Sequence, residues 1–169
     1  MKIDKAYWQN KDKITTSREE MLGDLKYEIW MFEETCGRLK VPCFTFERNL
    51  LWESFAIHAR VLIDFFYVNI FVSEGKKRNG CDRFNANDII AQDFMPVDER
   101  WEHIRQPITQ VLYDAREKAN KQLAHLSRWR IKLLKDRLND WEKHTDIRKD
   151  LEETIKIFSR ATGIRILEK

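Results

Sequence analysis

A stretch of almost 30 residues, from about Thr45 to about Val72, constrains the fold of this chain more than any other part of it. At 100° per residue, its apolar side chains cover most of the helical circumference, and its charged side chains fall in a band about 60° wide. A helix that is apolar nearly all round is buried among other helices. The sequence therefore predicts a long central helix.

A shorter helix is expected before this stretch. Thr16 or Ser17, followed by two glutamates, is the expected cap and acidic first turn. Apolar residues then follow helical spacing to about Leu39, and Pro42 ends the helix.

Further helices are expected after the central one. The segment NANDIIAQDFMP predicts a short helical turn, capped by Asn87 or Asp88 and ended by Pro96. A helix over residues 98–118 is kinked or split at Pro107 and continues, or restarts near Asn120. A final helix spans about 133–161, with Gly163 as its C-cap.

The prediction is an all-α bundle of about five helices. No period-two strand pattern survives beside the helical ones, and five Gly and three Pro are too few for many turns. A chain of 169 residues fits one domain, so we expect a single unit over 1–169, with 1–14 as a loose lead-in.

Composition narrows the cellular setting. The N-terminus has no apolar leader, no run reaches the length of a membrane span, and the three cysteines have no CxxC spacing. We therefore expect a cytoplasmic protein with no membrane partner. Residues 116–169 hold 15 Lys and Arg against nine Asp and Glu, which permits RNA contact without requiring it.

The charged band of the central helix supports two hypotheses. In the structural one, Arg60 bridges Glu53 and Asp64, and His58, which lies off the band, hydrogen-bonds to a neighbouring helix. In the functional one, the band is the floor of a cleft in which Arg60 binds a phosphate or carboxylate and a carboxylate acts as base. Glu53, His58 and Asp64 do not share a face and no ExxH pair occurs, so neither a metal nor a cofactor is expected.

Three segments together carry a family resemblance. WESFAIHARVLIDFFY, NDIIAQDF and NKQLAHLSRWR, in this order between Leu50 and Arg130, resemble an uncharacterised bacterial all-helical family with E-x4-H-x-R-x3-D-F and N-K-x2-A-H-L segments. This family is loosely similar to HEPN-like bundles. The matching positions are Glu53, His58, Arg60, Asp64, Phe65, Asp88, Asp93, Phe94, Asn120, Lys121 and His125.

The resemblance suggests that the polar members of this set converge. They would form either a pocket or a polar clasp that ties three segments together, and a clasp is favoured because a long loop over a helical core needs anchoring. The resemblance also implies a homodimer.

A second pair belongs to the HEPN comparison. Arg137 and His144 lie seven residues apart and would share a helix face, as in the Arg-x(4–6)-His signature of HEPN ribonucleases. With 15 Arg and four His in the chain, about one such match arises by chance. Leu138 also replaces the polar residue that usually follows the Arg in those nucleases.

The sequence therefore leads to three functional hypotheses. The first is a non-catalytic interaction or nucleotide/RNA-associated module, linked by analogy alone to stress or phage-defence systems. In it, Trp129 and Trp141 of the C-terminal region would suit a subunit or RNA contact. The second is a metal-independent ribonuclease that uses Arg137 and His144 across a dimer. The third is a small-ligand-binding protein in which Arg60 anchors an anion.

Overall fold

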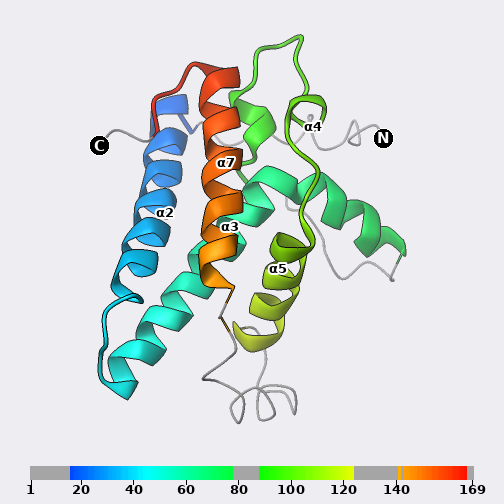
Figure 1. Cartoon of the computed structure of the whole chain (residues 1–169). Helices are drawn as coiled ribbons and strands as arrows, with labels where there is room; N and C mark the ends of the chain where they lie inside the picture. Colours follow the sequence, from blue (N-terminus) through cyan, green and yellow to red (C-terminus); the bar gives the residue numbers. More distant parts are fainter. Residues whose placement is uncertain (1–15, 78–87, 124–140, 142, 167–169) are drawn as a thin grey trace.

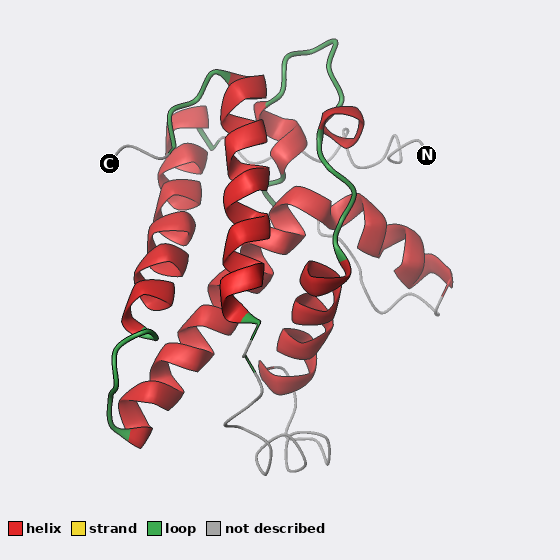
Figure 2. Ribbon diagram, in the orientation of Figure 1, coloured by secondary structure: helices red, strands yellow, loops and turns green. Residues whose placement is uncertain are grey.

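The fold is all-α, as predicted. The computed structural model describes residues 16–77, 88–123, 141 and 143–166, and within these ranges every regular element is a helix (Figures 1 and 2). The elements are α2 (Arg18–Arg38), α3 (Thr45–Lys77), the 3-10 helix η1 (Ala91–Phe94), α4 (Trp101–Ile104), α5 (Gln110–Leu123) and α7 (His144–Thr162).

The cap predicted for the first helix is confirmed at Ser17. Its side chain accepts from the backbone N–H of Glu20, and the carboxylate of Glu20 accepts from the backbone N–H of Ser17. This capping box satisfies two backbone donors at the start of α2. The interaction also lowers the pKa of Glu20, because the backbone hydrogen bond to Ser17 favours its charged form.

The long central helix is also confirmed. α3 packs against α2, α5 and α7, and it crosses behind α7 in the view of Figure 1. It continues to Lys77, five residues beyond the predicted end at Val72. Its fully buried side chains include Phe55, Leu62 and Ile63.

An aromatic cluster around Phe158 of α7 joins the short elements to the core. Rings of α3, η1 and α4 lie 5.5–5.8 Å from the Phe158 ring, and they belong to Phe65, Phe66, Phe94 and Trp101. The indole N–H of Trp101 donates to the backbone oxygen of Phe66 at 2.8 Å. The segment between α3 and α5 is therefore fixed by buried rings as well as by its chain connections.

Three predicted boundaries need correction. The helical turn begins after Ile90 rather than at Asn87 or Asp88, since the carboxylate of Asp93 accepts from the backbone N–H of Ile90. The helix predicted around Pro107 is split, and residues 105–109 are not helical. The last helix begins at His144 rather than near residue 133, and residues 124–140 lie outside the described part. Gly163 does end it, with φ 68° in the left-handed region.

Candidate functional site

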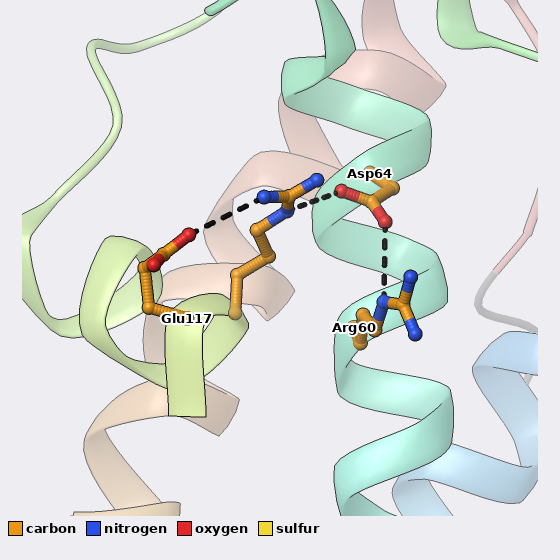
Figure 3. Close-up of polar contacts among 4 residues, drawn as sticks. Arg60, Asp64 and Glu117 are labelled. Carbon is orange, nitrogen blue, oxygen red and sulfur yellow. Dashed lines mark hydrogen bonds and ion pairs between the residues drawn. The ribbon is translucent and has the colours of Figure 1, made fainter. Parts of the chain in front are cut away.

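Asp64 joins the central helix to α5. Its carboxylate lies 2.8 Å from Nε of Arg116 and 3.5 Å from Nε of Arg60, and Glu117 lies 3.4 Å from the other end of Arg116 (Figure 3). The Arg116 side chain is 6% exposed, whereas those of Asp64 and Arg60 are 33% and 39% exposed. The predicted Arg60–Asp64 pair is present, and the shorter and more buried contact of Asp64 is with Arg116.

Arg116 was missed by the sequence reasoning. It lies in the apolar stripe of α5 together with Leu112, Ala115 and Ala119, all of them buried. Its guanidinium lies 4.0 Å from the ring centroid of Phe71. The sequence did contain one sign of this pair, because an arginine sits in the apolar stripe between two alanines. A buried charge at such a position needs a partner on a facing helix.

His58 makes the interhelical hydrogen bond that was predicted for it. Its Nδ1 lies 2.7 Å from the carboxylate of Glu28 on α2, and the His58 side chain is 10% exposed. The ring of Tyr27 meets the His58 ring edge-on at 6.0 Å. This pair fixes α2 against α3.

Glu53 does not take the part predicted for it. Its side chain is exposed, and within the described residues no ion pair joins it to Arg60. The hypothesis that Arg60 bridges Glu53 and Asp64 is therefore wrong for Glu53.

The predicted convergence of polar residues is not formed by those that the structure describes. His58 hydrogen-bonds to Glu28 of α2, whereas Asp64 accepts from Arg116 of α5, so the two residues contact different helices. Asp93 bonds within its own turn, Asp88 is exposed and Asn120 is half-buried. His125 lies outside the described residues.

Only one member of the predicted ribonuclease pair lies within the described residues. His144 is the first residue of α7, and a turn at Trp141 and Lys143 precedes it. Its Nδ1 lies 2.9 Å from the backbone oxygen of Trp141, and its ring packs edge-on to that of Trp52 at 5.3 Å. Arg137 lies outside the described residues.

Trp141 is a core residue. It is 6% exposed, its ring lies 5.2 Å from that of Phe55, and Lys118 Nζ lies 4.7 Å from the Trp141 ring centroid. The prediction of a subunit or RNA contact at Trp141 is therefore wrong. Trp129 lies outside the described residues.

A second charged pair joins α2 to α7. Arg148 contacts Glu33 across the helix interface and Glu152 on its own helix. Burial raises the pKa of Glu33 despite the attraction of Arg148. Burial likewise raises the pKa of the neighbouring Cys36 thiol to about 12, so Cys36 is not an activated nucleophile.

A cavity of about 410 Å³ opens between α3, residues 106–109 and α7. Polar groups in its wall bond to one another: the Tyr67 hydroxyl lies 3.1 Å from that of Thr154, and the Thr109 hydroxyl donates to Asp150 at 2.6 Å. Burial raises the pKa of Tyr67. Arg60 is not among its lining residues, so this cavity gives no support to an anion site at Arg60.

Several large apolar side chains of α2 and α3 are exposed among the described residues. We call this surface the outer face and define it by six of these side chains, which are Tyr27, Trp30, Phe46, Leu50, Ile57 and Val61. The four on α3 follow intervals of four, seven and four residues, which places them on one side of the helix. The Tyr27 ring lies 6.0 Å from that of His58, which follows Ile57 on α3, and Trp30 lies 6.2 Å from Tyr27. The outer face therefore spans both helices.

α3 also passes a test of length and composition for a membrane span. Residues Thr45–Phe71 are long and apolar enough to cross a membrane, and more than half of their most apolar stretch is buried inside the bundle. Core helices of soluble proteins meet the same criteria, so this property assigns no location.

Comparison of the chain with known protein families, with curated proteins and with solved structures gives no match in any of the three. The function is therefore inferred from the geometry of the molecule.

Proposed function

We propose that this protein is a non-catalytic interaction module that binds another protein chain through the outer face. The observation that carries the proposal is the exposure of large apolar side chains on one side of α2 and α3, from 40% for Val61 to 73% for Phe46. Contiguous exposed apolar surface of this kind is typical of protein–protein contacts.

The placement of the charged groups supports a non-catalytic role. His58, Asp64 and Arg148, which have the chemistry that a reactive site would need, each bond to a residue of a neighbouring helix. In such pairs the polar groups fix how the helices pack. No group of three His, Cys, Asp or Glu side chains suited to a metal occurs among the described residues.

Other parts of the proposal come from the sequence alone. The HEPN-like classification, the cytoplasmic location and an association with RNA or nucleotide stay predictions. The ribonuclease alternative has a direct test: RNA cleavage that persists in EDTA and is lost in His144→Ala would contradict a non-catalytic role. We expect no such cleavage.

Site-specific photo-crosslinking tests the outer face. A photoreactive phenylalanine derivative would replace Ile57 in the full chain, made in its native host, and the adducts would be identified by mass spectrometry. Lys149, exposed on α7, is the control position. We expect one defined protein adduct from position 57 that Val61→Lys removes, and none from position 149. Equal labelling at both positions, or no protein adduct at 57, would contradict the proposal.

A further inference from the structure

We infer that the protein bound at the outer face is a second copy of this chain, with the two α3 helices antiparallel and a two-fold axis at Ile57. The inference depends on the proposed function and adds the identity of the partner. It is carried by the order of apolar and charged side chains along the exposed side of α3.

The apolar residues of α3 suit such an axis. In an antiparallel pair centred on Ile57, each position before Ile57 faces the position equally far after it in the second copy. Phe46 then faces the half-buried Val68, and the two Ile57 side chains meet each other. Large side chains thus lie at both ends and at the centre of the contact.

The charges on the same side of α3 are self-complementary in this arrangement. Glu53 lies four residues before Ile57 and Arg60 lies three residues after it. Glu53 is exposed and is not paired with Arg60 of its own chain, while Arg60 is 39% exposed at 3.5 Å from Asp64. In the antiparallel pair Glu53 faces Val61 of the second copy, and the second copy's Arg60 is the next residue and lies on the same flank of the contact as Glu53, so this opposite-charge pair forms twice by symmetry.

A parallel pair would have the opposite effect. It would put Glu53 of one copy and Arg60 of the other on opposite flanks of the contact and seven residues apart in height, so the opposite-charge pair would not form. The charges therefore select the antiparallel arrangement. Asp64 of α3, one turn after Arg60, already contacts Arg116 of α5 at 2.8 Å; Figure 3 shows Asp64 beside Arg60.

Two charge reversals test this geometry. Sedimentation of the full-length chain should show a dimer for the wild type, and Glu53→Arg and Arg60→Glu should each weaken it about tenfold or more, because each homodimer then contains two repelling pairs. Mixing the two variants in equal amounts should restore a dimer. In the mixed dimer one contact joins the new Arg to the new Glu, and the other joins the native Glu53 to the native Arg60.

Two controls separate this effect from unfolding. Lys149→Glu reverses an exposed charge on α7 and should leave the dimer unchanged. Melting temperatures of the single variants should show that both fold, which matters for Arg60→Glu because the new carboxylate lies near Asp64.

Failure of the inference is distinct from failure of the proposed function. A wild-type chain that stays monomeric up to about 100 μM, or variants that do not recover on mixing, would overturn the second copy as partner. A position-57 adduct with a different protein would also rule out the second copy as partner. It would still agree with the proposed interaction module. An adduct with residues 1–15 of the same chain, or with lipid when vesicles are present, would overturn both.

Discussion

At the residue scale, the chemistry of each polar group follows from what packs around it. Asp64 is shared by an exposed arginine on its own helix and a buried arginine from α5. Exposed ion pairs contribute little to stability, while a buried charge that loses its partner costs several times more. The two arginines should therefore depend on Asp64 to very different extents.

Asp64→Ala should lower the free energy of unfolding by about 3 kcal/mol, because it removes an acidic partner that lies 2.8 Å from Nε of the buried Arg116. Arg60→Ala should lower it by less than about 1 kcal/mol, because that pair is exposed and 3.5 Å long. Urea unfolding of both variants measures the difference. Equal losses would show that the contact with Arg116 adds nothing to the stability of the bundle.

The sequence could predict part of this arrangement. The Arg60–Asp64 spacing of one helical turn is a local property, and so is the position of His58 away from that band. The partners Arg116 and Glu28 lie 52 and 30 residues away along the chain. Periodicity shows which face of a helix a residue occupies, but it does not show which helix packs there, so these partners required the tertiary structure.

At the element scale, helix ends with a local chemical cause were predicted well. Ser17 and Gly163 act through hydrogen bonds or backbone angles within a few residues. The start of α7 was predicted wrongly because its apolar spacing extends back past the turn at Trp141, whose buried ring belongs to the same core. Apolar spacing reports burial, and burial continues through a turn that interrupts the helix.

The contact between α2 and α7 should depend on pH. Burial raises the pKa of Glu33 above its usual value of 4.5. The folded chain therefore holds this proton more tightly than the unfolded chain, and the stabilising contribution of protonated Glu33 is lost as pH rises through the raised pKa. Glu33→Gln should remove this contribution to the pH dependence.

Thermal melting of both proteins between about pH 4 and pH 7 tests this effect. The melting temperature of Glu33→Gln relative to the wild type should rise with pH across this window. Comparing the difference cancels the titration of other groups such as Glu20, whose pKa shift has the opposite sign. A difference that falls with pH would mean that attraction to Arg148 outweighs burial at Glu33.

At the scale of the whole molecule, α3 has two roles that lie on different sides of one helix. Its buried side holds the bundle together, and its exposed apolar side contributes most of the outer face. The sequence showed a helix that is apolar nearly all round and suggested burial on every side. The described part of the bundle covers only some of that circumference, which is why the outer face was not predicted.

Ile57 and Ile63 separate the two roles, because they have the same side chain on the same helix but are 45% and 0% exposed. Ile63→Ala should lower the free energy of unfolding by about 3 kcal/mol through the cavity that it leaves. Ile57→Ala should lower it by about 1 kcal/mol or less and should weaken self-association instead.

Urea unfolding at protein concentrations below the dimer dissociation constant compares the two stabilities, since association would otherwise add to apparent stability. Sedimentation at higher concentration compares the self-association of the two variants. If both variants lost stability equally and both still associated, the exposed side of α3 would be part of the fold and would not serve as a binding surface.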